Sequence, residues 1–177
     1  LIQRSAEARA AASGNSVDEV LNSWAGGESV TVSAPKEEVV QEEVADRVID
    51  LIRGAMACLK IGLPEHLTTD VGPVVDQAAL DRLQTHIARM DKEAQLIAKA
   101  PVPQSLKGYF CSPCAYEIES LDQIGGEVFG PILHVMRYRK KELAHMIDAI
   151  HATGFGLTGG LHSRVQSTVE RVSKAVD

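Results

Sequence analysis

The segment from Val128 to Tyr138 is the part of this sequence that most restricts what the chain can fold into. It reads Val-Phe-Gly-Pro-Ile-Leu-His-Val-Met-Arg-Tyr, an almost continuous run of apolar residues. A strand with one solvent-exposed face would alternate apolar and polar residues, so this run is typical of a strand that is buried on both faces. Segments with the periodicity of amphipathic helices precede and follow it. We therefore predict the α/β class, with helices layered on a sheet.

Four segments have the apolar spacing of amphipathic helices. The clearest runs over 41–59, and a second over 78–90, with Asp76 placed to cap it. A third covers 140–151, and the last carries apolar residues at helical spacing between 165 and 176. The side chains predicted to face the core are Val44, Val48, Leu51, Ile52, Ala55, Met56 and Leu59 in the first helix, Leu80, Leu83 and Ile87 in the second, and Leu143, Met146, Ile147 and Ile150 in the third. The apolar residues of the last helix are Val165, Val169, Val172 and Val176.

The first 35 residues differ in composition from the rest, because they are rich in Ala, Ser, Gly and Glu. Within them, 17–24 has helical spacing, and 30–34 alternates apolar with polar residues as a short strand does. Residues 108–118 are also strand-like. We predict a degenerate N-terminal segment over 1–35 and one α/β domain over 36–177.

Charge and composition exclude several classes of partner. The formal net charge is -6 and the pI is about 5.5, whereas binding nucleic acid requires a basic face that neutralises phosphates. No apolar run approaches the roughly 20 residues that a membrane helix needs. The first ten residues lack the apolar core of a secretory signal, and 3 cysteines cannot all pair with one another. We therefore predict a reduced, cytoplasmic chain that binds neither nucleic acid nor membrane.

Cys111 and Cys114 have the C-x-x-C spacing of metal and redox sites. A zinc site needs four ligands, and the sequence has neither a second C-x-x-C nor an H-x-x-x-H pair. A redox pair of the thioredoxin type opens a helix, whereas these residues lie in a predicted strand. We favour two incidental thiols and predict no metal site. Cys58, in the last turn of the first helix, is predicted to be packed.

Two other motifs can each be interpreted in two ways. The glycine-rich segment 154–160 can cradle a phosphate, but it lacks the G-x-G-x-x-G order and the Lys-Ser/Thr ending, so a plain helix-to-strand turn is favoured. Glu127 stands just before Gly130 and Pro131 at the start of the predicted strand, where a carboxylate can reach a ligand hydroxyl. On the residues alone, a solvated glutamate is slightly favoured.

In this order, the two motifs resemble those of the aldehyde dehydrogenase superfamily. Glu-Val-Phe-Gly-Pro at 127–131 matches its E-[IV]-F-G-P signature, and 154–164 matches its later G-[YF]-G-L-T-x-G motif. The resemblance extends over about 39–177 and implies a fragment of the layered αβα catalytic domain. Within the superfamily, the chain is similar to the L-glutamate γ-semialdehyde (1-pyrroline-5-carboxylate) dehydrogenase module of bifunctional PutA proteins, in the stretches 41–56, 67–76, 127–138 and 152–164.

The resemblance implies NAD-dependent oxidation of a small-molecule aldehyde, L-glutamate γ-semialdehyde, to glutamate in proline catabolism. In the family a cysteine thiolate attacks the aldehyde, hydride passes to the nicotinamide, and water activated by a glutamate hydrolyses the thioester. Carried over to this sequence, Glu127 hydrogen-bonds the ribose on the nicotinamide side and Phe129 helps to hold the cofactor.

The sequence departs from the family where the nucleophile is expected. Counting back from Gln41 places that position at Val32, which has no nucleophilic atom, and no E-T-G-G with the general-base glutamate occurs. We expect a chain that is truncated at both ends, without the dinucleotide-binding half, and inactive alone, with no catalytic residue of its own. The alternatives are a non-catalytic interaction module, as a homo-oligomer or bound to a complete dehydrogenase, and a gene remnant without a selected function.

Overall fold

The computed structural model describes residues 31–34, 37–154 and 159–176, and within them six strands form one mixed sheet. The strands are β1 (Thr31–Ala34), β2 (Glu37–Gln41), β3 (Gln95–Lys99), β4 (Cys114–Ile118), β5 (Ile132–Tyr138) and β6 (Gly160–His162). The helices are α3 (Glu42–Ala57), α4 (Gln77–Glu93), α5 (Leu143–Ala152) and α6 (Gln166–Val176), with short 3-10 helices η1 (Leu121–Ile124) and η2 (Lys140–Glu142).

The strand order across the sheet is β3-β4-β5-β2-β1-β6. β5 lies in the interior and runs parallel to both of its neighbours, β4 and β2. Five of its seven residues are buried, which confirms the prediction of a strand covered on both faces. It begins at Ile132 rather than Val128, because Gly130 and Pro131 form a turn in which the Ile132 amide donates to the Gly130 carbonyl at 2.9 Å.

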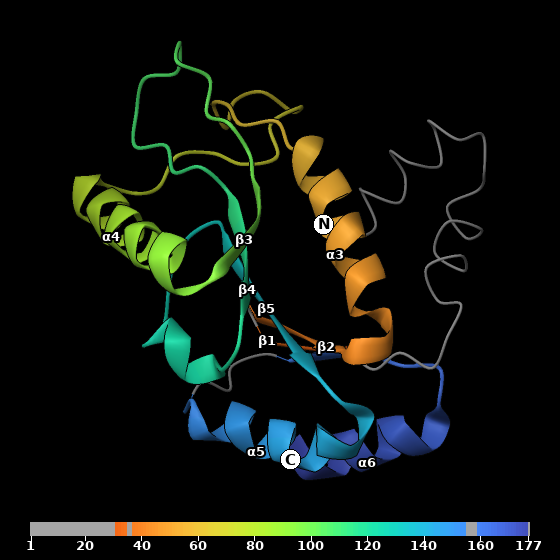
Figure 1. The fold of residues 1–177 in the computed structure, drawn as a ribbon. Coiled ribbons are helices and arrows are strands. Elements are labelled where there is room, and N and C mark those ends of the chain that lie inside the picture. Colours follow the sequence, from red (N-terminus) through yellow and green to blue (C-terminus); the bar gives the residue numbers. More distant parts are fainter. Residues whose placement is uncertain (1–30, 35–36, 155–158, 177) are drawn as a thin grey trace, which may run out of the picture.

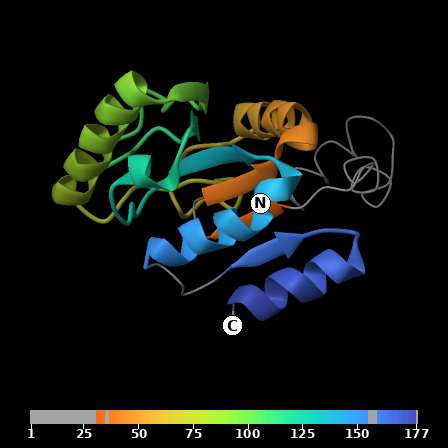
Figure 2. The same cartoon turned by 60° about the horizontal axis from the view of Figure 1, so that its bottom comes forward.

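Helices cover both faces of the sheet, as the predicted αβα layering requires. α3 and α4 lie on opposite sides of the strands (Figure 1), and α5 and α6 contact each other and flank β6 in Figure 2. The buried side chains form two separate clusters. The α3 side contains Val40, Ala45, Ile49, Met56, Ile97, Ala115 and Val135; the other side includes Leu83, Ile87 and Met90 of α4, Leu143, Met146 and Ile147 of α5, Val172 of α6, and Tyr116, Ile132, Met136 and Tyr138 of the strands.

Both long helices were predicted, with differences of detail. Asp76 caps α4, where its Oδ1 accepts a hydrogen bond from the Ala79 amide at 2.7 Å. On α3 the buried side chains are Ala45, Ile49 and Met56, whereas Leu51, which we expected to face the core, is only half-buried. The sequence has apolar residues in two adjacent rows of this helix, so its periodicity could not decide which row faces the sheet.

Cys58 is exposed, so the prediction that it is packed was wrong. The helix ends at Ala57 and Cys58 is its C-cap. The residue therefore lies just after the last helical residue, and its side chain is open to solvent.

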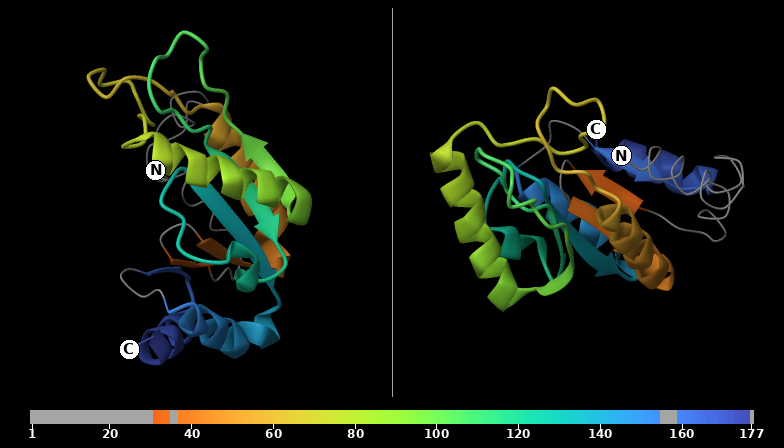
Figure 3. Two further views of the ribbon diagram at one scale, coloured as in Figure 1. Left: turned by 90° about the vertical axis from the view of Figure 1, so that its left-hand side faces the viewer. Right: turned by 90° about the horizontal axis from the view of Figure 1, so that it is seen from above.

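Strand prediction was correct in part. The alternation at 30–34 corresponds to β1, but the predicted strand 108–118 forms only from Cys114. The preceding residues belong to a loop that meets the loop before α4, where the Val74 amide donates to the Tyr109 carbonyl at 2.8 Å. Both loops project from the same end of the molecule (Figure 3). The predicted helix at 17–24 lies outside the described residues.

Candidate functional site

The Glu-Val-Phe-Gly-Pro motif forms a sharp connection between η1 and β5, and we call residues 125–131 the corner. It opens with Gly125 and Gly126, whose φ angles are +73° and +148°. Residues other than glycine rarely adopt such φ angles, so these two glycines allow the chain to reverse direction here. The turn then presents Glu127 and Phe129 outward, and the Phe129 side chain is 72% exposed.

An open groove of about 620 Å³ runs between the corner and α4. Glu127 and Phe129 line it from the corner, and Arg82 and His86 line it from the helix. Val75, which is 85% exposed, adds an apolar surface from the loop before α4. The groove therefore combines one carboxylate, basic side chains and exposed apolar surface.

Gly130 lets the corner approach α4 closely. A Cβ at this position would lie 2.4 Å from Cδ2 and 2.5 Å from Cδ1 of Leu83. Leu83 is 2% exposed and belongs to the main core, so it has little room to withdraw. The glycine of the motif is thus explained by packing against the helix.

Arg89 of α4 binds the chain just before the corner. Its guanidinium donates to the carbonyl oxygens of Gln123 at 2.6 Å and Ile124 at 2.7 Å. The same group lies 3.3 Å from Nδ1 of His86, and Nε2 of His86 lies 2.9 Å from Nε2 of the buried His134 in β5. Burial, followed by the positive charge of Arg89, lowers the pKa of His86.

The corner offers two kinds of group to a ligand, a carboxylate and an exposed aromatic ring. A carboxylate such as that of Glu127 accepts hydrogen bonds from hydroxyl groups, and an exposed phenyl ring offers an apolar surface to a planar ring. Both side chains open onto the same groove. The central part of the second motif, 155–158, lies outside the described residues. Its ends join α5 to β6, in agreement with the helix-to-strand connection that the spacing favoured.

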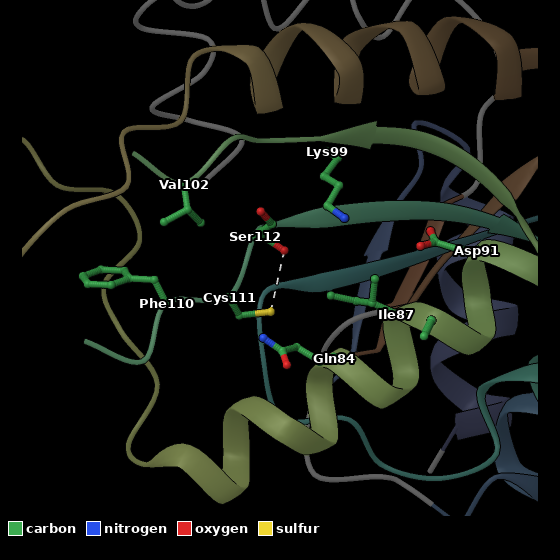
Figure 4. Close-up of a pocket in the computed structure, with 9 residues that line it drawn as sticks. Gln84, Ile87, Asp91, Lys99, Val102, Phe110, Cys111 and Ser112 are labelled. Carbon is green, nitrogen blue, oxygen red and sulfur yellow. Dashed lines mark hydrogen bonds between the residues drawn. The ribbon is translucent and has the colours of Figure 1, made fainter. Parts of the chain in front are cut away.

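A second hollow, of about 310 Å³, lies on the other side of α4 and contains Cys111 (Figure 4). Cys111 and Cys114 are buried, free thiols, and both sulfurs lie near the Ser112 carbonyl oxygen. Burial raises the pKa of Cys111 and raises that of Cys114 to about 11. Since the thiolate is the nucleophilic form, neither residue is activated. In the described part of the chain, no three His, Cys, Asp or Glu side chains gather as a metal site would require.

Val32, the residue at which counting back from Gln41 predicts the nucleophile position, lies inside the sheet. It pairs with Val39 of β2 on one side and Leu161 of β6 on the other. Through β2 it is in register with Met136 of β5. The spacing between neighbouring strands and the rise per residue along β5 then place the backbone of Val32 on the order of 15 Å from Ile132, the first residue after the corner.

The fold and the corner define the class of protein. The aldehyde dehydrogenase family profile matches residues 15–177, and the chain belongs to that family. It is similar to the bifunctional protein PutA of Klebsiella aerogenes, with 39% identity over 140 residues that cover 76% of this chain and 11% of that protein. It is also 29% identical over 141 residues to the 1-pyrroline-5-carboxylate dehydrogenase of Bacillus subtilis, covering 78% of this chain and 27% of that enzyme.

The structural comparison agrees with the sequence comparison. A crystal structure of proline utilization A (PutA) from Bradyrhizobium japonicum matches with a TM-score of 0.77 and 46% identity, over 82% of this chain and 15% of that one. The chain thus spans between about a tenth and about a quarter of the length of these relatives. Among the described residues, no helix is both long and apolar enough to cross a bilayer.

The structure brings Glu127 and Phe129 together in one groove. It adds Arg82, His86 and Arg89, which the sequence analysis did not single out. These three lie at steps of four and three along α4, a spacing that places them on one face of the helix. That spacing was the available signal, but nothing in the sequence indicated that the corner would pack on this face.

Proposed function

We propose that this chain is the part of an L-glutamate γ-semialdehyde (1-pyrroline-5-carboxylate) dehydrogenase that contacts the nicotinamide end of NAD. Its function is then NAD-dependent oxidation of that aldehyde to glutamate in proline catabolism. We further propose that the 177-residue chain does not catalyse this reaction by itself. The observation that carries the proposal is the corner, which holds Glu127 and Phe129 on one groove next to α4.

Glu127 supports the cofactor role through its position. Its carboxylate is exposed on the groove, where it can accept hydrogen bonds from two neighbouring ribose hydroxyls. Phe129 supplies apolar surface two residues later. When bound, NAD supplies a hydride acceptor, and the role of these side chains is to orient it.

Val32 supports the proposal that the chain is inactive alone. Covalent aldehyde oxidation requires a nucleophile that can bond to the carbonyl carbon, and a valine side chain has none. The general-base glutamate of E-T-G-G does not occur in the sequence either. Loss of a covalent nucleophile typically removes several orders of magnitude of rate.

Calorimetric titration with NAD tests the cofactor role. We expect binding by the wild-type chain that is roughly 10- to 100-fold weaker in Glu127→Gln, the loss typical of a hydrogen bond to a charged group. Glu119→Gln is the matched control, because Glu119 is also exposed but lies before η1 and outside the groove. Equal affinity in wild type and Glu127→Gln, or a folded chain that binds no NAD, would contradict the proposal.

An aldehyde oxidation assay with NAD tests the proposed inactivity. Glutamate γ-semialdehyde and a simple aliphatic aldehyde serve as substrates, and reduced cofactor is followed by absorbance. We expect no turnover above background. Turnover that a thiol-blocking reagent abolishes would show that one of the 3 cysteines acts as a nucleophile, and the proposed inactivity would be wrong.

The valine at position 32 also favours a second function, that of a non-catalytic module that associates with another copy of this chain or with a complete dehydrogenase. Phe129 and Val75 are exposed on one groove, and exposed apolar surface of this kind favours association. Light scattering and co-purification with a 1-pyrroline-5-carboxylate dehydrogenase test this function. A chain that remains monomeric and does not co-purify would rule it out.

A further inference from the structure

The corner is fastened at both of its ends by side chains from one face of α4. Before the corner, Arg89 donates to the carbonyl oxygens of Gln123 and Ile124 at 2.6 Å and 2.7 Å. After the corner, His86 meets His134, the third residue of β5, with 2.9 Å between the two Nε2 atoms. Arg89 and His86 also contact each other, at 3.3 Å. One connected set of side chains therefore spans the seven residues of the corner.

The direction of hydrogen bonding in this set follows from the arginine. A guanidinium can only donate, so Nδ1 of His86 accepts from Arg89 and carries no proton. Neutral His86 then has its proton on Nε2 and donates it to Nε2 of His134. His134 accepts at Nε2, which places its own proton on Nδ1. Arg89 thus sets the tautomer of both imidazoles.

We propose that Arg89, His86 and His134 form a hydrogen-bond relay that positions the corner, and that uptake of a proton by the relay in mild acid releases it. All three act as positioning residues. The inference deepens the proposed function and rests on it, because the side chains that the relay positions are Glu127 and Phe129.

A proton taken up at either imidazole breaks the relay. On His86 it would place an N–H at Nδ1 against the guanidinium of Arg89, which is itself a donor and a positive charge. On His134 it would place an N–H at Nε2 against the N–H of His86. His134 is 1% exposed, so water cannot solvate the resulting cation.

Groups from every neighbouring element bear on this titration. α4 contributes Arg82 and Glu93 beside His86, and Glu127 lies across the groove. Tyr116 of β4 is the register neighbour of His134, and its hydroxyl donates to Asp91 at 2.6 Å. On β2 the register position beside His134 is Glu37. Arg89, which lies 3.3 Å from Nδ1 of His86, opposes protonation of His86, while Glu93 favours it.

Nitrogen NMR of the imidazoles tests the relay in the full 177-residue chain without any cofactor. Near neutral pH we expect two neutral rings of opposite tautomer, with the proton on Nε2 of His86 and on Nδ1 of His134. Through-bond correlation from the backbone of each histidine to its ring assigns the imidazole signals in the wild type, so the assignment needs no variant. A charged ring at His86 near neutral pH, or a proton on its Nδ1, would overturn the proposal without any variant having to bind a ligand.

Fluorine NMR tests whether the relay controls the corner. The chain has 3 phenylalanines, so fluorophenylalanine labelling gives a simple spectrum, and Phe129→Leu identifies the corner signal. Between about pH 8 and about pH 5, the range in which histidine titrates, we expect this signal to shift with a midpoint below 6.5, the ordinary pKa of histidine.

The variants separate a relay from a general effect of acid. His86→Gln should abolish the pH-dependent shift of the Phe129 signal, whereas His66→Gln, in the exposed loop before α4, should leave it unchanged. An unchanged shift in His86→Gln, or no shift in the folded wild type, would overturn the proposal. If His86→Gln does not fold, the tautomer measurement on the wild type still decides. Failure of NAD to bind would refute the proposed function while leaving these spectra unaffected.

Discussion

At the scale of the residue, Gly130 shows how closely the corner and α4 approach each other. A Cβ there would meet two methyl carbons of Leu83 at 2.4 Å and 2.5 Å. We expect Gly130→Ala to lower the free energy of unfolding by about 1–3 kcal/mol, the usual effect of overpacking a core. Urea denaturation followed by circular dichroism measures the change.

Gly54→Ala is the matched control for that experiment. Gly54 lies in the exposed part of α3, and a Cβ there would meet nothing within 4 Å. Because glycine inside a helix is less favourable than alanine, this variant should raise the free energy of unfolding by about 0.5–1 kcal/mol. Equal effects of the two substitutions would show that the Leu83 side chain can move aside at little cost, and that the corner and α4 are not tightly packed at Gly130.

Val32 allows a second prediction at this scale. Val32→Cys would place a thiol at the position that counting back from Gln41 predicts for the nucleophile of the family. We expect no aldehyde oxidation in this variant, because the residue is paired on both sides within the sheet and reacting atoms must approach within about 3–3.5 Å. Formation of reduced cofactor by the variant, but not by the wild type, would contradict this expectation.

At the scale of the element, the first turn of α4 depends on Asp76. Its carboxylate accepts from the Ala79 amide at 2.7 Å, and loss of such a cap typically costs about 0.5–2 kcal/mol. We expect Asp76→Ala to lower the free energy of unfolding by about 1 kcal/mol, and Asp76→Asn to have little effect because asparagine caps equally well. Thermal or urea unfolding checks both. A similar loss in the two variants would mean that charge, rather than the cap, is responsible.

The elements differ in how far the sequence predicted them. α3 and α4 were predicted because each carries apolar residues at helical spacing over many residues, and β5 was predicted because its apolar run is nearly continuous. β2 and β3 were missed, since five-residue strands with one or two fully buried apolar side chains leave little periodic signal. The residues of the site can likewise be divided into those that the sequence indicated and those that it did not. A continuous motif predicted Glu127 and Phe129, whereas His86 and His134 are 48 residues apart, and only the packing of α4 on the sheet brings them together.

At the scale of the whole molecule, two ionisable groups on opposite faces of the sheet contribute to stability with opposite dependence on pH. Burial lowers the pKa of His86 from 6.5 and raises that of Glu38 from 4.5. Below pH 6.5 the unfolded chain binds a proton at His86 that the folded chain resists, so stability falls as the pH falls. Above pH 4.5 the folded chain keeps a proton on Glu38 that the unfolded chain releases, so stability falls as the pH rises.

Two variants separate these contributions. His86→Gln should retain more of its stability as the pH falls below 6.5, because the group that resists protonation is gone. Glu38→Gln should lose less stability than the wild type as the pH rises above 4.5, because a neutral amide replaces the buried carboxylate. Urea midpoints at a series of pH values measure both effects, with His66→Gln and Glu65→Gln in the exposed loop as controls. If the urea midpoint of either variant changes with pH as that of the wild type does, burial of that group does not contribute to the pH dependence of stability. If both differ in the predicted directions, the two faces of the sheet titrate as separate, opposing contributions to one folding equilibrium.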